Sequence, residues 1–306
     1  MIQIFRKTIK GKKLQELREL KSGAWIDVSE ATTEEIKMVA DLAELDFEDV
    51  DDVMDDYEIP RIEGHEKSVV MFVRSPAPSN RLMETDVLMI VLTEKYLVTI
   101  STRKNPYIRQ VLKNKKLPPT TEQAGFLGHL LLKITQAYTK KIKQLSDESM
   151  QKRRELENIN SDDIAQLTEN TEVLSQYLSA LEPMESVYKT LLVGKLISLN
   201  EEDHDVFEDL FNSINQSIDV CIDRIRGLGS LRDAYQIIFT NDLSKTIKFL
   251  TSFTILLTIP TIVASIYGMN VDLPLENHPL AFWFLMVLVI IVSLALMVWF
   301  RKKKWF

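Results

Sequence analysis

Hydrophobic residues form two long, uninterrupted runs near the carboxyl end of the 306-residue chain. Residues 249–267 contain no charge, and as a helix they would span about 28 Å, close to the hydrocarbon thickness of a bilayer. Residues 280–300 are more strongly apolar, with Trp283 and Trp299 near their ends, as in an aromatic belt. Because the runs follow one another in tandem, the pattern predicts a transmembrane helical hairpin.

The distribution of charge predicts the orientation of this hairpin. Lys245 and Lys248 precede the first run, whereas the connecting segment 268–279 has no basic residue and carries Asp272 and Glu276. The residues directly after the second run are basic: Arg301, Lys302, Lys303 and Lys304. By the positive-inside rule both termini are cytoplasmic and the acidic loop lies outside, as in a multi-pass plasma membrane protein. The first residues contain no apolar core of a signal peptide, so none is expected.

The first run differs from the second in carrying hydroxyl groups on one helical face. They recur every three or four residues: Thr251, Thr254, Thr258, Thr261 and Ser265. Only Ser252 lies off this stripe. Such hydroxyls can bond across a helix interface or to their own backbone, or they can line a hydrated path. The second interpretation requires an oligomer, because one two-span chain encloses no pore.

Residues 1–119 alternate strand and turn signals. A helix is predicted for residues 33–44, and the short connection 93–95 is typical of a hairpin. The predicted strands are residues 2–5, 25–28, 69–74, 87–92 and 96–101. Strands with interspersed helices predict a cytoplasmic α/β domain.

Long helices are predicted between this domain and the membrane, so residues 120–248 are expected to form a stalk and residues 249–306 the hairpin. Thr120 with Gln123 resembles a capping box. Asn200, followed by three acidic residues, is a good N-cap for a last helix running unbroken into the first span, on the order of 100 Å long. Gly227 and Gly229 are expected to weaken this helix locally.

The remaining composition excludes several classes of function. A formal net charge of −7 argues against a nucleic-acid partner. The single cysteine, Cys221, forms no intramolecular disulfide and fits a small core residue. Glycine-rich phosphate loops, catalytic triads and zinc-ligand spacings are missing, so neither an enzyme nor an organic cofactor is expected. His204, beside acids at a helix start, is a weak metal-ligand candidate.

Residues 46–58 are the densest acidic segment of the chain. Five of its six aspartates are the candidates for a shared role: Asp49, Asp51, Asp52, Asp55 and Asp56. Two interpretations stay open, a solvated helix face and a site for Mg²⁺ or Ca²⁺, which prefer carboxylate oxygens.

The first hydrophobic run ends in Tyr267, Gly268, Met269 and Asn270. This tetrapeptide, closing the first of two carboxyl-terminal spans after a long helix, resembles the signature of the CorA-type magnesium and cobalt transporters. The segments 25–35, 60–63 and 248–251 are similar to other parts of that family, so the resemblance covers the whole chain.

The resemblance implies a funnel-shaped homopentamer in membrane lipid that conducts divalent cations and has Mg²⁺ as both transported and regulatory ion. The four signature residues would form the selectivity filter, with Asn270 amide oxygens in a ring around a hydrated ion. Asp272 and Glu276 would concentrate cations outside. The resemblance favours pore lining for the hydroxyl stripe and extends the lining to the inner residues Ser244 and Ile247.

A regulatory metal site is also implied. Asp209 matches the family's acid on the long helix, and Asp52 falls near the partner acid of the neighbouring subunit. The adjacent acids are alternatives to Asp52: Asp49, Asp51, Asp55 and Asp56. Cytoplasmic Mg²⁺ bound there would hold the pore closed.

This sequence departs from the family pattern at Ser244, Ile247, Thr258, Pro260 and the outer loop, so the preference among Mg²⁺, Co²⁺ and Ni²⁺ stays open. A zinc transporter of the related branch is one alternative. A non-conducting, membrane-anchored coiled-coil scaffold is another, although a scaffold has no need of a hydroxyl stripe.

Overall fold

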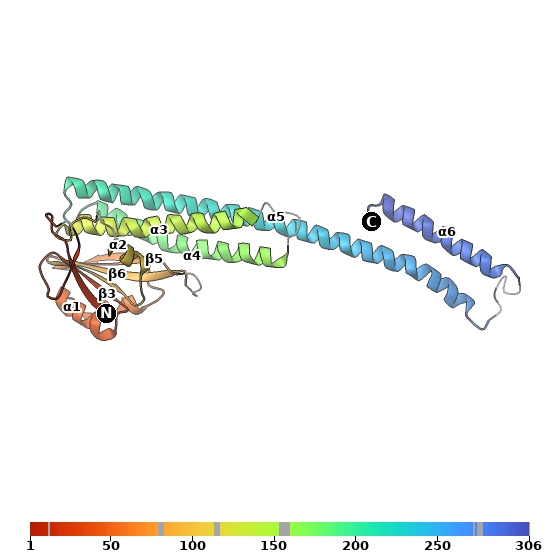
Figure 1. Cartoon of the computed structure of the whole chain (residues 1–306), viewed down its shortest axis with the longest axis horizontal. Helices are drawn as coiled ribbons and strands as arrows, with labels where there is room; N and C mark the ends of the chain where they lie inside the picture. The colour runs from red at the N-terminus through yellow and green to blue at the C-terminus, as the bar shows by residue number, and fades with distance from the viewer. Residues whose placement is uncertain are drawn as a thin grey trace. The chain divides into compact units, whose positions relative to one another are not determined.

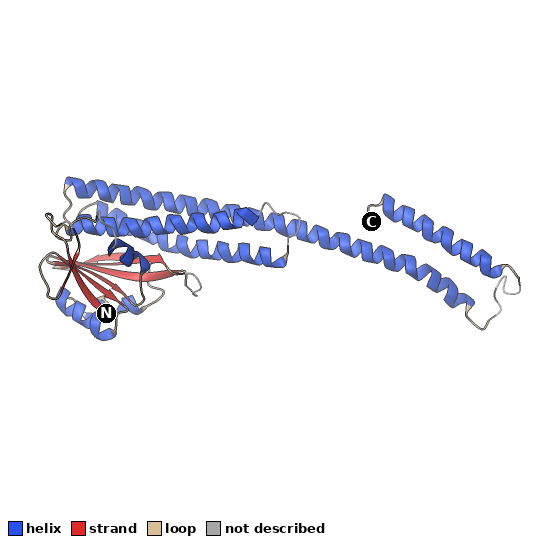
Figure 2. Cartoon of the chain, in the orientation of Figure 1, coloured by secondary structure: helices blue, strands red, loops and turns tan. Residues whose placement is uncertain are grey.

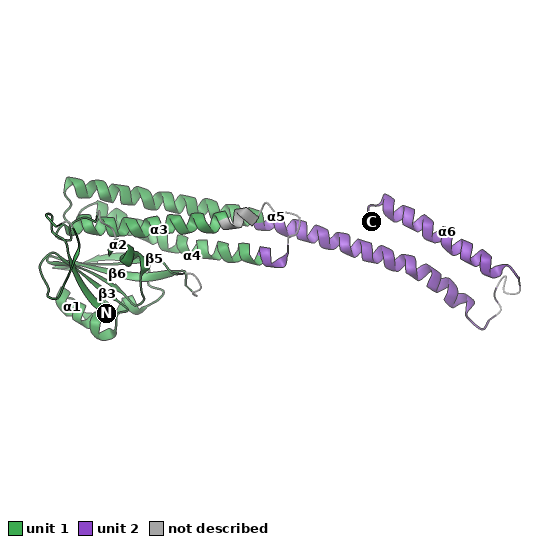
Figure 3. Cartoon of the chain, viewed as in Figure 1, with its two compact units in different colours: residues 1–156, 165–231 green, residues 157–164, 232–306 purple. Residues whose placement is uncertain are grey.

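The computed structural model describes residues 1–11, 13–78, 83–112, 117–152, 160–271, 273 and 278–305, with only the backbone for 148–152. The chain divides into two compact units (Figure 3). Unit 1 contains residues 1–156 and 165–231, and unit 2 contains residues 157–164 and 232–306. Two helices, α4 (Ser161–Leu192) and α5 (Glu201–Tyr267), contribute to both units, and the units are described separately below.

Unit 1 is built on a seven-stranded sheet with the order β2-β1-β3-β7-β6-β5-β4. Neighbouring strands are antiparallel except β3 and β7, which are parallel. The strands are β1 (Ile2–Arg6), β2 (Gln15–Leu17), β3 (Ala24–Ser29), β4 (Arg61–Gly64), β5 (Ser68–Pro76), β6 (Thr85–Thr93) and β7 (Tyr96–Ser101). The five predicted strands and the β6–β7 hairpin are therefore confirmed, whereas the sequence did not predict the two outer strands β2 and β4.

Both faces of the sheet are covered by helices (Figures 1 and 2). On one face, α1 (Thr33–Ala43) packs its apolar side on the strands, with Ile36 and Phe72 fully enclosed. Two short 3₁₀ helices, η1 (Phe47–Asp49) and η2 (Asp51–Met54), extend this layer. The other face carries α2 (Pro106–Leu112) and α3 (Gln123–Lys152). Burial on both faces explains why β5 and β6 are nearly continuous apolar runs.

The helices α3, α4 (Ser161–Leu192) and α5 pack together within unit 1 through buried aromatic side chains (Figure 1). Tyr138 and Tyr177 meet edge to face, with ring centroids 5.4 Å apart. The fully buried Tyr188 lies 3.3 Å from the Thr135 hydroxyl. Cys221 is buried, and its thiol donates to the Leu174 carbonyl oxygen, as expected of a core residue.

The amino ends of the long helices differ from one another in their caps. At α5 the Asn200 side chain accepts from the Asp203 amide at 2.8 Å, so the predicted N-cap is confirmed. The predicted capping box of α3 is wrong. The Thr120 hydroxyl instead accepts from the Lys7 amide and donates to the Gly23 carbonyl, because tertiary partners in the sheet loops satisfy it first.

The prediction of one unbroken last helix is confirmed, since α5 runs from Glu201 to Tyr267 through Gly227, Gly229 and Pro260. Two described helices are long and apolar enough to cross a membrane. They are α5, through its apolar carboxyl-terminal part, and α6 (Ala281–Lys302), and both of these segments belong to unit 2. Leu256 and Pro260 of α5 line an apolar groove with α6 residues such as Met286 and Ile290. The second span, α6, therefore packs along one side of the first span.

Candidate ion pathway and regulatory acids

The face of α5 that packs in the hairpin is identified by burial. Its members are the buried Ser252 and the half-buried Leu256, Ile259, Val263 and Tyr267. All five residues of the hydroxyl stripe are exposed. At about 100° per residue, the centres of the two sets lie roughly opposite each other around the helix. The stripe therefore does not face α6, which excludes bonding to α6 as its role.

Three hydroxyls of the stripe donate to their own backbone. Thr254, Thr258 and Thr261 bond the carbonyl oxygens four residues earlier, at 2.8–3.0 Å. The proton is thereby directed along the helix, and the oxygen lone pairs are left facing outward. This face of α5 is consequently rich in hydrogen-bond acceptors, the groups that a hydrated cation prefers.

The stripe continues toward the amino end of the helix. Ile247 is 55% exposed and falls on the same face, and Ser244 is half-buried one turn earlier. Neither residue lies on the face that packs against α6. The structure thus puts the seven candidate pathway residues on one side of a single helix.

The signature residues lie at the carboxyl end of this helix. Tyr267 is its last residue, and the amides of Gly268 and Met269 donate to the Ala264 and Ile266 carbonyls at 3.0 and 3.2 Å. Asn270 follows and is exposed. The left-handed conformation common at helix ends is found at neither Gly268 nor Asn270, since the described residues with positive φ lie elsewhere. A Cβ at Gly268 would instead lie 3.1 Å from the Ala264 carbonyl oxygen, which explains the glycine.

The outer acidic residues Asp272 and Glu276 fall outside the described residues. Their expected role in concentrating cations stays a prediction.

The acidic segment 46–58 forms η1, η2 and the turn after them, so it is a set of tight turns rather than one helix face. Asp52 pairs with Arg61 at 2.7 Å, and Asp56 pairs with Arg103 at 2.6 Å. Asp51 is half-buried, and its carboxylate has no hydrogen-bond or ion-pair partner among the described residues. The clustered charges are thus partly neutralised within the chain, with Asp51 left free.

The remaining two candidate aspartates, Asp49 and Asp55, are engaged more weakly. The Asp49 carboxylate accepts from the Asp46 amide at 3.2 Å and lies 3.9 Å from the His65 ring. The Asp55 carboxylate accepts from the Tyr57 amide at 2.8 Å. Both bonds stabilise the turns and leave carboxylate lone pairs open.

Three arginines organise this segment, and sequence reasoning did not identify them. Arg61 contacts Glu58 and Glu63 as well as Asp52, and it lies 4.3 Å above the Phe72 ring. Arg74 is buried and donates to the Asp56 and Glu58 carbonyls, and burial lowers its pKa. The available signal was a basic residue in two strands that follow the acids, Arg61 in β4 and Arg74 in β5, and another, Arg103, just after β7.

Asp209 is exposed on α5. Among the described residues, no hydrogen bond or ion pair joins Asp209 to the acidic segment of its own chain. Nearby on α5, the side-chain atoms of His204, Asp205 and Glu208 that could bind a metal lie within 4.8 Å of one another, and all three residues are exposed. Exposed groups at helical spacing commonly lie this close without an ion.

An α/β domain, a continuous long helix and an apolar two-helix hairpin with one acceptor-rich face are the features expected of a membrane transport protein. Comparison with known proteins gives the family. The model of the CorA-like Mg²⁺ transporter proteins matches residues 21–302, so the chain belongs to that family. It is therefore a divalent-cation transporter homologue and not an enzyme.

Individual relatives agree with this assignment. The cobalt/magnesium transport protein CorA of Methanocaldococcus jannaschii is 27% identical over 297 residues, covering 92% of this chain and 90% of the relative. The magnesium transport protein CorA of Wolinella succinogenes is 27% identical over 38% of each chain.

Solved structures share the fold. The complete CorA magnesium transporter of M. jannaschii superimposes with a TM-score of 0.81 at 24% identity, covering 100% of this chain and 99% of that one. The full-length CmaX protein gives 0.72 at 17% identity, covering 99% and 97%. The ZntB cytoplasmic domain of Vibrio parahaemolyticus gives 0.61 at 10% identity, covering 78% of this chain and 98% of that one.

Proposed function

We propose that this protein is a homopentameric, channel-like importer of Mg²⁺ in the plasma membrane, with Co²⁺ and Ni²⁺ as further substrates and both termini in the cytoplasm. The membrane potential would drive entry of the cation. The observation that carries the proposal is the acceptor-rich hydroxyl face of α5, directed away from the packing face of its own hairpin.

The pathway follows from the chemistry of that face. In lipid, the free lone pairs of Thr254, Thr258 and Thr261 would have no donor, whereas water around a cation supplies donors. Five copies of the stripe around an axis enclose such a path, with Ile247 as an apolar constriction. Ser244 would line the inner end.

Selectivity is assigned to the segment Tyr267, Gly268, Met269 and Asn270 at the outer end. Mg²⁺ gives up its water reluctantly, so amide and carbonyl oxygens that bond the hydrated ion suit it better than a dehydrating cage. Asp272 and Glu276 would raise the local cation concentration at this mouth.

Regulation is assigned to cytoplasmic Mg²⁺ bound between Asp209 of one chain and the acidic segment of the next. Asp52 is the first candidate there, and the alternatives are Asp49, Asp51, Asp55 and Asp56. Carboxylates brought together across an interface repel unless a cation lies between them. Occupied sites would hold neighbouring stalks in the closed arrangement. The transported ion would then limit its own entry, within the limit set by its differential affinity for the two states.

The test is uptake of Mg²⁺, Co²⁺, Ni²⁺ and Zn²⁺ into liposomes containing the purified protein. We expect Mg²⁺ uptake by the wild type and a loss of about tenfold in the double variant Thr254→Val, Thr258→Val, because two of the five hydroxyl positions of the lining then offer no acceptor to the hydrated ion. Ser252→Ala is the matched control, since it removes a hydroxyl from the opposite face. Equal uptake by the double variant and the control would contradict the proposed path, and Zn²⁺ uptake without Mg²⁺ uptake would contradict the substrate.

A further inference from the structure

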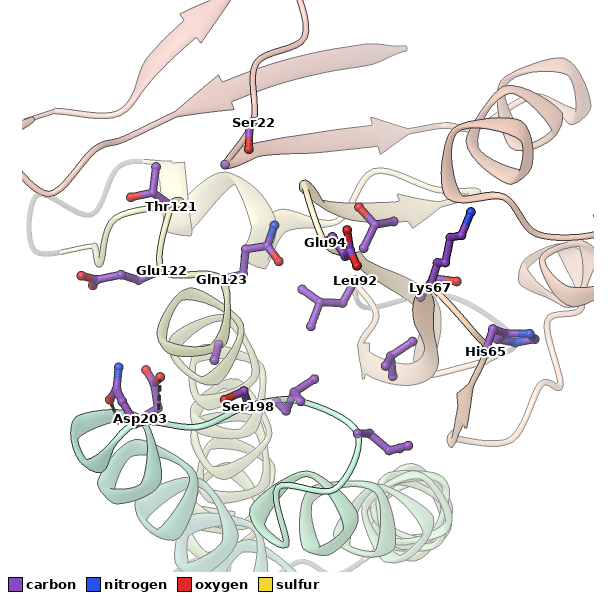
Figure 4. A pocket seen from close by; sticks show the side chains of 18 of the residues that line it. Ser22, His65, Lys67, Leu92, Glu94, Thr121, Glu122, Gln123, Ser198 and Asp203 are labelled. Atoms are coloured by element: carbon purple, nitrogen blue, oxygen red, sulfur yellow. Dashed lines mark hydrogen bonds between the residues drawn. The ribbon is translucent and has the colours of Figure 1, made fainter.

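A cleft of about 750 Å³ lies in unit 1, where loops at one end of the sheet meet the amino ends of α3 and α5 (Figure 4). Its volume falls within the range of small-molecule sites, roughly 300–1,000 Å³. Its described lining includes Arg6, Ser68, Glu94, Thr121, Gln123 and Asp203 and no residue of the proposed pathway or acidic segment. We call it the polar cleft.

Unpartnered polar atoms are concentrated in this cleft. Seven buried side-chain nitrogen or oxygen atoms in the described part of the chain lack a hydrogen-bond partner. Four of them belong to its lining: Arg6 Nε, His65 Nε2, Ser68 Oγ and Thr121 Oγ1. Ser68 is only 5% exposed. Because each such group costs about 1–3 kcal/mol and native proteins retain few, their grouping marks a place for a polar ligand.

The amino end of α3 adds further donors. The Thr120 hydroxyl bonds Lys7 and Gly23 and does not cap the helix. The backbone N–H groups of Gln123 and Ala124 consequently have no acceptor among the described residues. A 30-residue helix also presents the positive end of its dipole here. Free amides at a helix start, with a nearby guanidinium, form an arrangement that binds phosphate.

Acidic side chains surround these donors. Figure 4 shows Glu122 and Asp203 beside the amino ends of α3 and α5, with Glu94 across Gln123 from them. Asp203 is 8% exposed. A bare anion would be repelled by this set of carboxylates, whereas a phosphate that carries a divalent cation offers oxygens to the donors and positive charge to the acids.

The geometry points to a binding site for a nucleoside phosphate held as its divalent-cation complex. The phosphate lies on the α3 amino end with Arg6 and Thr121, and the cation is balanced by the surrounding carboxylates. The nucleoside would then lie toward Leu92 and Ile197, two apolar residues of the same lining.

The experiment is calorimetric titration of the full-length protein in detergent with ADP in excess Mg²⁺. Binding is expected, and Arg6→Gln weakens it about tenfold or more, the effect of one lost charged hydrogen bond. Thr121→Val, of nearly unchanged shape, weakens it less. Arg18→Gln is the control, because Arg18 is an exposed residue outside the cleft lining and loses the same charge.

Three outcomes would overturn the assignment. One is no ADP binding at millimolar concentration in Mg²⁺, and another is equal affinity in the Arg6 and Arg18 variants. The third is equal affinity for inorganic phosphate and ADP, or for ADP in Mg²⁺ and in EDTA. Binding is measured without conduction, so the result is independent of whether the chain transports ions.

Discussion

Asp27 is a buried carboxyl group in the middle of β3, only 4% exposed. It accepts hydrogen bonds from Thr99 at 2.8 Å and Ser29 at 3.1 Å, and Thr99 in turn accepts from the Trp25 indole. Burial raises the pKa of Asp27, and the two hydroxyl bonds offset only part of that effect. The folded chain therefore binds this proton at a higher pH than the unfolded chain does.

The consequence is a pH-dependent difference between the wild type and Asp27→Asn. Because the folded pKa lies above the unfolded value, protonation of Asp27 stabilises the fold at low pH, and this contribution is lost as the pH rises through the folded pKa. Between the two pKa values, the free energy of unfolding changes by about 1.4 kcal/mol for each pH unit. Melting temperatures measured in detergent between pH 8 and pH 4 should thus favour the wild type increasingly once the pH falls below the folded pKa. A constant difference over that range would contradict the raised pKa.

Asn270 is predicted to be needed for conduction but not for assembly. It lies three residues past the end of α5 and is exposed, so its amide buries no apolar surface within the chain. Asn270→Ala should keep the oligomer and lose most Mg²⁺ uptake, because the proposed ring of amide oxygens is removed. Light scattering and liposome uptake measure the two properties on the same sample. Normal Mg²⁺ uptake by a correctly assembled Asn270→Ala variant would contradict the proposed selectivity ring.

At the scale of elements, α3 and α5 approach each other through glycines. A Cβ at Gly128 would lie 2.8 Å from Val206 Cγ1 of α5, whereas a Cβ at Gly227 would meet nothing within 4 Å in the chain. Gly128→Ala should lower stability, since overpacking costs about 1–3 kcal/mol and exceeds the gain in helix propensity. Gly227→Ala, the matched control, should raise stability by up to about 1 kcal/mol. A melting temperature that rises in Gly128→Ala, or changes equally in the two variants, would contradict the close contact.

The pairing of the acidic segment with arginines bears on gating. If Mg²⁺ acts between Asp209 and Asp52, it must compete with Arg61 for the Asp52 carboxylate. Arg61→Gln should therefore lower the Mg²⁺ midpoint of closure by about fivefold, the effect of a partly exposed ion pair. Asp209→Ala should raise the midpoint instead. Protease protection of the stalk, titrated with Mg²⁺, measures both.

Lys104→Gln is the control for this titration, because Lys104 pairs with Glu30 on the exposed surface outside the acidic segment. An unchanged midpoint in both the Arg61 and Asp209 variants would leave these acids as solvated surface.

At the scale of the whole molecule, apolar side chains before the first span need a partner. Ile237, Leu243 and Ile247 are each more than half exposed in the chain, although they precede the membrane segment. Exposed apolar groups of this kind mark interaction surfaces. We predict a pentamer in mild detergent, with a protein mass five times the 35.3 kDa of the chain. A monomer or dimer in all detergents, measured by multi-angle light scattering, would contradict the proposed pore.

The sequence by itself determined the two apolar spans, the unbroken α5 and the five inner strands of the sheet. Each of these follows from a local pattern, such as the charge-free run 249–267 or the cap at Asn200, because helix and strand formation depend on neighbouring residues. The edge strands β2 and β4 were missed, since each is short and is defined by its neighbouring strand rather than by its own residues.

Only the tertiary structure decided which groups are already engaged. Thr120 bonds sheet loops instead of capping α3, and Arg61 and Arg103 neutralise aspartates up to 47 positions away. The sequence placed the hydroxyl stripe on one face of α5, but packing of α6 on the opposite face decided which of its roles remain possible. These outcomes depend on hydrogen bonds and contacts between residues distant in the chain, for which no local periodicity carries a signal.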